Sequence, residues 1–350
     1  MKYIGIIDCG TTNSRFSIVS EDGSTLSNIS AKIGVKDTAA SSSKEPLIRG
    51  LRHLFERALA EAGLNRYELT LVMSSGMITS ELGLMELPHQ LAPVAKKDLA
   101  TSLYKLPGGS DLGIGIDMFL VRGIKNAADP VRGSPISAAK RLDFMRGEET
   151  QMIGLLEIYG GGTAATAVNL SSHTKYISID ERDRILGSVT TLSGQVYESL
   201  VTDSIIAKSV IAGSRDEVIE DEAELVRDLR EAGLFAVEAV RDHGLLRSFL
   251  MPRFMDTLMF TDWRVRKRFL EACIVADDLN VLKAFPEFGF NVGERVFLIG
   301  IEERCTLFEE LLRLTPEGKN LEIMVISGDE PVRNLAIKGA LAIAREAGFL

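Results

Sequence analysis

The strongest chemical signal lies in the first fifteen residues of the chain. An apolar segment ends in Asp8, and glycine and small hydroxyl or amide residues separate it from a second apolar segment that starts at Phe16. A turn without bulky side chains lets a phosphate approach backbone N–H groups, and a nearby carboxylate can hold a divalent cation against that phosphate. We therefore predict that Asp8 orients a metal ion; the alternative is an ordinary hairpin with a surface aspartate. The phosphate-binding candidates are Gly10, Thr11, Thr12 and Asn13.

A second Gly-Thr stretch lies at mid-chain, within residues 158–168. It repeats the order of apolar segment, glycine-rich turn and apolar segment, so we predict a second phosphate-binding hairpin there. Its candidate residues are Gly161, Gly162 and Thr163. The alternative is a flexible turn retained only for its geometry. Three consecutive glycines disfavour that alternative, because each one costs conformational entropy unless a close approach requires it.

Two similar halves must position these turns. Each half opens with a strand, a Gly-Thr turn and a strand, and then adds helix–strand units, a pattern typical of α/β folds. The predicted strands are 2–8, 15–20, 25–33, 69–74, 112–121, 296–299 and 323–326, with further strands up to about residue 190. The predicted helices are 45–62, a segment ending near Glu157, most of 195–283, a helix through Leu314 and 331–347. We therefore predict an N-terminal domain, 1–142, and a C-terminal domain, 143–350, with a cleft lined by 8–13 and 160–163.

Composition narrows the classes of partner. The chain has 350 residues, 45% of them hydrophobic, and a net charge of −9. An acidic surface disfavours nucleic acids and anionic membranes, and no apolar segment approaches the length of a membrane span. The four histidines lack metal-ligand spacing, which disfavours a zinc site. Three scattered cysteines and the lack of a signal-peptide pattern predict a cytoplasmic protein with reduced thiols.

At residues 145–151, with the sequence MRGEETQ, the chain resembles the 2-dehydro-3-deoxygalactonokinase family. Further matches occur in the expected order and span nearly the whole chain. They are residues 8–15, residues 75–80 with Glu86 and Pro88, Gly162-Thr163, residues 191–194, Gly300 and Gly328. The resemblance implies two ribonuclease-H-like α/β domains of the sugar kinase, Hsp70 and actin type, with an interdomain nucleotide cleft. It also implies ATP and Mg²⁺ as co-substrates, transfer of the γ-phosphoryl group to a six-carbon 2-keto-3-deoxy sugar acid, and Gly300 and Gly328 as nucleotide contacts.

The same resemblance assigns catalytic candidates. A carboxylate must take the proton of the sugar hydroxyl, and Glu148, which follows a glycine as the acid does in related carbohydrate kinases, is our choice. Asp143 and Glu149 are the competitors. Arg146 could clamp the substrate carboxylate bidentately. The alternatives are that Glu148 and Glu149 are first-turn acids favoured by the helix dipole, and that Arg146 pairs with a nearby acid.

Substrate contacts are predicted in the loops that share the resemblance. The candidates are Arg15, Met77, Ser80, Glu86 and His89. For Arg15 and His89 the alternative is a solvated surface side chain. The expected partner is a small-molecule sugar acid, and the protein could form a homodimer. The alternative function is a divergent non-catalytic or regulatory nucleotide-binding protein of the same fold.

Overall fold

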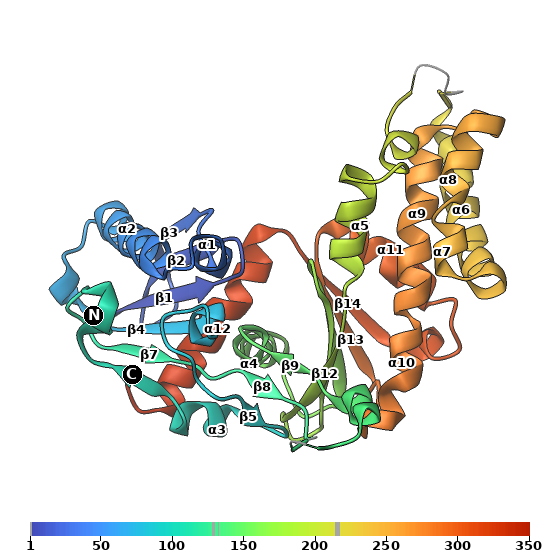
Figure 1. Ribbon diagram of the computed structural model, residues 1–350. Coiled ribbons are helices and arrows are strands. Elements are labelled where there is room, and N and C mark those ends of the chain that lie inside the picture. Colours follow the sequence, from blue (N-terminus) through green and yellow to red (C-terminus); the bar gives the residue numbers. More distant parts are fainter. Residues whose placement is uncertain (1, 128–129, 132, 214–217) are drawn as a thin grey trace. The chain divides into compact units, whose positions relative to one another are not determined.

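The computed structural model describes residues 2–127, 130–131, 133–213 and 218–350 (Figure 1). The chain divides into two compact units. Unit 1 consists of residues 1–164, 178–188 and 329–350, and unit 2 of residues 165–177 and 189–328. Unit 1 therefore includes residues 143–164 and 329–350, whereas the sequence-based prediction assigns these residues to the C-terminal domain. The predicted boundary between 142 and 143 stays a prediction.

Unit 1 is built on a mixed sheet of six strands. In spatial order the strands are β3 (Thr25–Ala31), β2 (Ser14–Ser20), β1 (Tyr3–Cys9), β4 (Leu69–Gly76), β7 (Met118–Leu120) and β6 (Tyr104–Leu106). The first three strands pair antiparallel, whereas β4 runs parallel to β1. The predicted opening hairpin is thus confirmed. A small second sheet of the same unit contains β5 (Gln90–Leu91), β8 (Ile124–Lys125) and β9 (Phe144–Met145).

The α-helices of unit 1 are α1 (Val35–Ser41), α2 (Glu45–Ala62), α3 (Lys96–Thr101), α4 (Glu148–Tyr159) and α12 (Asp329–Glu346). Helix α2 packs on β2 and β3, and helix α12 packs on β1 and β4. The apolar positions of α2 recur at helical spacing and are buried, and Gly63 ends the helix with a positive φ of 66°. This confirms the predicted helix 45–62 and its glycine cap.

Two glycines let α4 and α12 pack backbone against backbone. A Cβ atom on Gly154 would overlap the carbonyl oxygen of Leu335, and a Cβ atom on Gly339 would overlap that of Thr150. Both glycines lie inside their helices, where glycine costs about 0.5–1 kcal/mol relative to alanine. The close approach compensates for that cost and fixes α4 in the unit.

A five-stranded sheet lies mostly in unit 2 and repeats the strand order of the six-stranded sheet. Its spatial order is β12 (Ile185–Thr191), β11 (Thr174–Ile179), β10 (Ala165–Leu170), β13 (Arg295–Gly300) and β14 (Glu322–Ser327). Strand β13 runs parallel to β10, and β14 runs parallel to β13. Strands β10, β11 and β12 therefore correspond in order to β1, β2 and β3. Both sheets are mixed and combined with helices, as the predicted α/β class requires.

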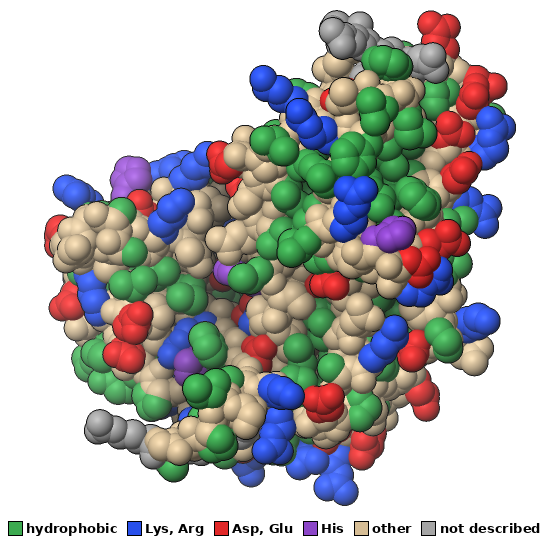
Figure 2. Space-filling model, turned by 45° about the vertical axis from the view of Figure 1, so that its right-hand side comes forward, with side chains coloured by type: hydrophobic (Ala, Val, Ile, Leu, Met, Phe, Trp, Pro, Cys, Tyr) green, Lys and Arg blue, Asp and Glu red, His purple; other side chains and the backbone are tan. Residues whose placement is uncertain are grey.

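The remaining helices belong to unit 2. They are α5 (Ser193–Thr202), α6 (Glu222–His243), α7 (Leu245–Ser248), α8 (Met251–Phe254), α9 (Trp263–Asp278), α10 (Asn280–Ala284) and α11 (Glu302–Leu312). The prediction that most of 195–283 is helical is confirmed for the described residues; residues 214–217 lie outside them. Exposed apolar side chains occur on this part of the chain, among them Ile205, Leu246, Leu258 and Met259. Figure 2 shows a group of apolar side chains gathered on the face in view.

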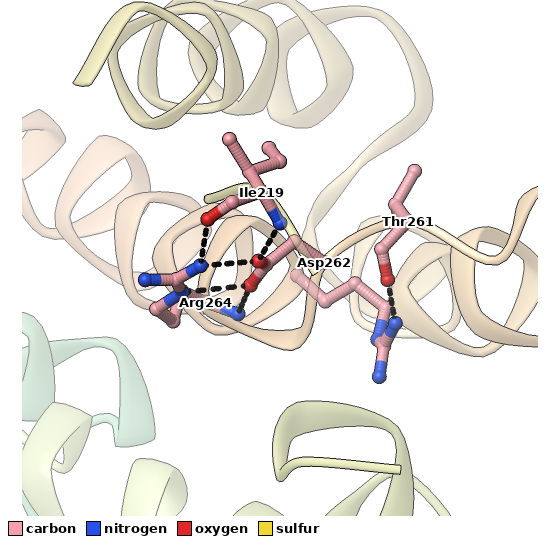
Figure 3. Close-up of polar contacts among 5 residues, drawn as sticks. Ile219, Thr261, Asp262 and Arg264 are labelled. Carbon is pink, nitrogen blue, oxygen red and sulfur yellow. Dashed lines mark hydrogen bonds and ion pairs between the residues drawn. The ribbon is translucent and has the colours of Figure 1, made fainter. Parts of the chain in front are cut away.

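Asp262 fixes the start of α9 (Figure 3). Its carboxylate accepts hydrogen bonds from the backbone N–H groups of Ile219 at 3.0 Å and Arg264 at 2.8 Å, and from the Arg264 side chain. The guanidinium of Arg264 also donates to the carbonyl of Ile219 at 2.9 Å. Hydrogen bonds from Arg264 hold the pKa of Asp262 at about 2. The carboxylate therefore stays ionised and ties the segment around Ile219 to α9.

Two sequence-based predictions about elements are wrong. Residues 158–168 form no hairpin, because Ile158 and Tyr159 end α4 and β10 starts only at Ala165. The strand predicted over 112–121 is limited to Met118–Leu120. Gly113 and Gly115 have positive φ values of 59° and 75°, which interrupt an extended backbone before Met118.

The three cysteines are all free and buried. Burial raises the pKa of Cys9 and of Cys273 to about 12 and the pKa of Cys305 to about 11. The thiols therefore stay protonated at neutral pH. Among the described residues, no helix combines the length and the apolar character needed to cross a membrane.

Candidate functional site

Asp8 lies at the carboxyl end of β1, beside both neighbouring strands. It is opposite Arg15 on β2 and opposite Ser75 on β4. The Asp8 side chain is 25% exposed, and its Oδ2 lies 3.4 Å from Nη1 of Arg15. Burial raises the pKa of the Asp8 carboxyl, while the charge of Arg15 opposes that rise. The pKa of Asp8 is raised in spite of Arg15, so a further cation beside this carboxylate would be favourable.

The turn after β1 is held from behind by the start of α1. The carbonyl oxygens of Gly10 and Thr11 accept hydrogen bonds from the backbone N–H groups of Val35 at 3.3 Å and Lys36 at 2.9 Å. Gly34 permits this contact, because a Cβ atom there would overlap the Thr11 oxygen. In a trans peptide the C=O and the following N–H point in opposite directions. The N–H groups of Thr11 and Thr12 therefore point away from α1, and the side chains of Thr11, Thr12 and Asn13 are exposed.

Two further glycines bring α4 to the same edge of the sheet. Gly76 ends β4 with a φ of 90°, and a Cβ atom on it would overlap the carbonyl oxygen of Cys9. Gly147 precedes α4 with a φ of 107°, and its Cβ position would lie 3.2 Å from Cα of Gly76. The backbones of three elements thus meet where β1 and β4 end. Only glycine allows this approach at these φ values.

The acids of the first turn of α4 lie at this junction. Oε2 of Glu148 accepts a hydrogen bond from the Arg146 backbone N–H at 3.1 Å, and Glu148 is half-buried. Glu149 is fully buried, and both of its carboxylate oxygens accept the Gly147 N–H, at 2.9 and 2.8 Å. Burial, followed by the charge of Glu148, raises the pKa of Glu149 to about 8. The pair therefore combines an accessible carboxylate with a buried carboxyl that is protonated at neutral pH.

Arg146 connects these acids to the loop after β4. Its Nη1 donates to Oγ1 of Thr79 at 2.7 Å, and its Nη2 donates to the carbonyl of Leu87 at 2.9 Å. Burial lowers the pKa of Arg146, and the charges of Glu149 and Glu86 oppose that shift. A guanidinium has five N–H donors, so these two contacts leave donors for another partner.

The structure brings most of the predicted substrate residues of this loop together. Ser80 donates to the carbonyl of Met77 at 2.7 Å, at the end of the short helical turn that also carries Thr79. His89 and Arg146 both lie against Gly123, where a Cβ atom would contact each of them. The His89 ring packs on Phe144 with centroids 5.1 Å apart. Glu86 is exposed and acts on Arg146 through its charge.

Asp143 is committed to other contacts. Its Oδ1 accepts a hydrogen bond from Oγ of Ser188 at 2.9 Å, and its carbonyl accepts the N–H of Asn126. Asn126 in turn bonds to the backbone of Ser188. Asp143 therefore belongs to a network that holds the segment before α4, and it is a weaker catalytic candidate than Glu148.

The segment Gly160–Thr163 lies at the other end of α4. The helix has 12 residues, which corresponds to a length of about 18 Å. The carboxylate of Asp183 accepts the N–H of Gly162 at 2.7 Å, and a Cβ atom on Gly161 would overlap it. An aspartate already occupies this loop. The predicted phosphate contacts of Gly161, Gly162 and Thr163 stay predictions.

The topology identifies a different counterpart of the turn 10–13. In the five-stranded sheet the hairpin β10–β11 takes the place of β1–β2, so the corresponding turn is 171–173, Ser171-Ser172-His173. Gly300 ends β13 beside Leu170, and Ser327 ends β14 beside Gly300, directly before Gly328. The turn and both predicted glycines therefore share one edge of the sheet, where ligands bind in α/β folds. Short polar residues between the apolar segments 165–170 and 174–179 were the signal that sequence reasoning missed.

A pocket of about 120 Å³ lies in unit 2. Apolar and acidic residues line it together with Thr191 and Ser193. They are Leu192, Val196, Leu245, Phe249, Ile274, Asp277 and Asp278. Oγ of Ser193 donates to the Asp278 carboxylate at 2.6 Å. A Cβ atom on the neighbouring Gly194 would overlap the carbonyl oxygen of Ser171, so the pocket adjoins the turn 171–173.

The candidate metal site at Asp8 suits Mg²⁺ better than a metal ion that is coordinated only by protein side chains. In the described part of the chain, no three His, Cys, Asp or Glu side chains gather as a metal site. Mg²⁺ usually keeps several waters and binds through one or two carboxylates plus substrate phosphates. A single, partly compensated carboxylate such as Asp8, next to a turn with outward N–H groups, fits that coordination.

Comparisons with known proteins agree on one family. The family described as 2-keto-3-deoxy-galactonokinase matches residues 8–324. A Rhizobium meliloti (strain 1021) protein, named as a probable 2-dehydro-3-deoxygalactonokinase, is 24% identical over 333 residues, covering 95% of this chain and 94% of that protein. The crystal structure of a candidate 2-dehydro-3-deoxygalactonokinase from Sinorhizobium meliloti matches 98% of each chain, with a TM-score of 0.70 and 20% identity. These likenesses confirm the predicted α/β fold of the sugar kinase, Hsp70 and actin type.

Proposed function

Because the chain belongs to the 2-keto-3-deoxy-galactonokinase family, we propose that it phosphorylates a six-carbon 2-keto-3-deoxy sugar acid, with ATP as donor and Mg²⁺ as metal. One observation carries the proposal. The backbones of Cys9, Gly76 and Gly147 meet, so that the strand end with Asp8 and the acids of α4 share one edge of unit 1. Phosphoryl transfer depends chiefly on positioning and charge neutralisation, and this edge offers both.

Each candidate site residue of unit 1 then has a role. Mg·ATP supplies the phosphoryl group and the cationic charge that offsets its negative charge. Asp8 would hold the metal ion. Glu148 accepts the proton of the sugar hydroxyl, and Arg146 pairs with the sugar carboxylate through its remaining donors. Glu149, with a pKa of about 8, stays protonated at neutral pH and adds no second negative charge beside the base.

In the turn 10–13, the N–H groups of Thr11 and Thr12 are the proposed donors to phosphate in unit 1, because the N–H of Gly10 already donates to the carbonyl of Asn13. For unit 2 we propose the turn 171–173 as a further phosphate contact and the pocket beside Ser193 as the nucleoside contact. Support comes from the shared sheet edge of the turn, Gly300 and Gly328. In the pocket, apolar walls and two carboxylates suit a base and its sugar hydroxyls.

The function is tested by ADP release in the presence of Mg·ATP. The acceptor panel contains 2-keto-3-deoxy sugar acids, aldonic acids and neutral hexoses. We expect stimulation by a 2-keto-3-deoxy acid and no stimulation by neutral hexoses, which lack the carboxylate for Arg146. If no acceptor stimulates release and ATP does not bind, the chain is a non-catalytic member of the fold.

Location and assembly stay proposals. The cysteine pattern supports a cytoplasmic protein, and fractionation of the producing cells measures it. Sedimentation equilibrium of the purified chain measures whether it forms the predicted homodimer.

A further inference from the structure

Arg304, near the start of α11, holds the turn 171–173 through backbone carbonyl groups. Its Nη1 donates to the carbonyl oxygens of both Leu170 and Ser171, each at 3.1 Å. The backbone N–H of Gln195 donates to the carbonyl of Ser172 at 2.8 Å. Donors from α11 and α5 therefore bind three successive carbonyl groups of this segment.

These hydrogen bonds fix the direction of the amide hydrogens. In a planar trans peptide, the N–H of the next residue points opposite to the C=O. The carbonyls of Leu170 and Ser171 thus turn the N–H groups of Ser171 and Ser172 away from Arg304. In the same way, the carbonyl of Ser172 turns the N–H of His173 away from Gln195. Successive N–H groups that point to one side form a concave site for anions.

Backbone N–H groups hold the corresponding turn of unit 1. There, backbone N–H groups of Val35 and Lys36 bind the carbonyls of Gly10 and Thr11. A glycine permits close approach in both units, Gly34 in the first and Gly194 in the second. Unit 2 adds a guanidinium, whose hydrogen bonds are stronger than those of a neutral amide.

We propose that Arg304 is a positioning residue for polyphosphate binding: it presets the N–H groups of the turn 171–173 and places a positive charge behind them. The inference rests on the proposed use of ATP. It names a residue 133 positions away in sequence from Ser171, outside every motif that supports the family assignment.

A second role for Arg304 has to be separated from this one. Burial raises the pKa of Asp278, and hydrogen bonds from Ser193 and Thr191 and the charge of Arg304 oppose that rise. Arg304 therefore also acts on a carboxylate of the pocket. A residue that serves the pocket should affect adenosine and ATP alike, whereas a residue that serves the turn should affect only ligands with phosphates.

The experiment compares Arg304→Ala, Arg304→Lys and the control Arg313→Ala by calorimetry with ATP, ADP and adenosine. Arg313 is at the other end of α11 and pairs with Glu309. We expect Arg304→Ala to weaken ATP and ADP binding about 10–100-fold, the effect of one or two charged hydrogen bonds, with adenosine unchanged. Arg304→Lys should be intermediate, and guanidinium ion at sub-denaturing concentration should partly restore ATP binding to Arg304→Ala.

Several outcomes overturn the inference. Equal losses for ATP and adenosine would assign Arg304 to the pocket, and unchanged ATP affinity in a folded Arg304→Ala variant would remove it from the site. Unfolding midpoints show whether each variant is folded; if Arg304→Ala is not, the ratio of ATP to adenosine affinity in Arg304→Lys decides. If the wild-type chain binds adenosine but not ATP, the phosphate role fails. If the wild-type chain binds neither adenosine nor ATP, the proposed function itself is wrong.

Discussion

Glu149 is a buried acid whose ionisation opposes folding. Its pKa is raised from 4.5 to about 8, so between these pH values the folded chain holds a proton that the unfolded chain has lost. Stability therefore falls as pH rises through this window, and the loss stays constant above it. Each pKa unit corresponds to about 1.4 kcal/mol, so the total is on the order of a few kcal/mol.

We expect Glu149→Gln to flatten this pH dependence. The measurement is the free energy of unfolding in urea at several pH values between 4 and 9. Glu157→Gln is the control, because Glu157 lies on the same helix but is exposed and pairs with Lys96. Parallel curves for the wild type and Glu149→Gln would show that the carboxyl ionises normally.

Glu148 is predicted to be the general base. Glu148→Gln should lower turnover about 10²–10⁴-fold and leave the KM of the sugar acid nearly unchanged. Asp143→Asn is the comparison, since Asp143 is bound to Ser188 and should affect stability more than turnover. Near-normal turnover in Glu148→Gln, together with inactive Asp143→Asn, would transfer the role to Asp143.

Arg146 is predicted to bind the substrate carboxylate while it holds the loop after β4. Arg146→Lys should raise the KM of the sugar acid about tenfold or more, because a lysine cannot bind a carboxylate bidentately. Thr79→Val removes one loop contact of Arg146 but keeps its charge. If Thr79→Val raises KM as much as Arg146→Lys, the arginine acts by positioning the loop and not by binding substrate.

At the scale of elements, the packing of α4 against α12 supports the site. Gly154→Ala should destabilise the chain by about 1–3 kcal/mol, because the new methyl group would overlap the Leu335 carbonyl. Gly233→Ala in α6 is the matched control. No atom lies near its Cβ position, so the alanine should stabilise by about 0.5–1 kcal/mol. Urea unfolding measures both, and a neutral Gly154→Ala would show that the two helices can separate at little cost.

Local patterns predicted the elements well where period and caps agreed. The hairpin β1–β2 follows from two apolar segments around a glycine turn, and helix α2 follows from helical spacing and the Gly63 cap. The segment 160–163 failed because three glycines indicate a turn without showing what it connects. Helix α4 is buried around much of its surface, through Met152, Ile153 and Leu155. Its sequence therefore lacks a clear helical period, and Ile158-Tyr159 at its end resemble the start of a strand. Sequence reasoning missed Asp183 and Arg304 because their contacts join residues that are 21 and 133 positions apart.

At the scale of the whole molecule, ligand binding should appear as stability. A ligand that binds only the folded chain adds RT ln(1 + [L]/Kd), about 2.7 kcal/mol at one hundred times Kd. We expect Mg·ADP to raise the midpoint of thermal unfolding by a few degrees, and ADP with EDTA to raise it less. In Asp8→Asn the difference between these two conditions should disappear. If Mg²⁺ adds the same increment in the variant, Asp8 does not hold the metal.

The burial of all three thiols has a practical consequence for spectroscopy. Maleimide reagents attack thiolates at the surface, and Cys9, Cys273 and Cys305 offer none at neutral pH. A cysteine introduced at an exposed position can therefore carry a fluorophore or spin label without removal of any native residue. With one label on each unit, energy transfer or dipolar spectroscopy can follow the distance between the units in solution as nucleotide is added.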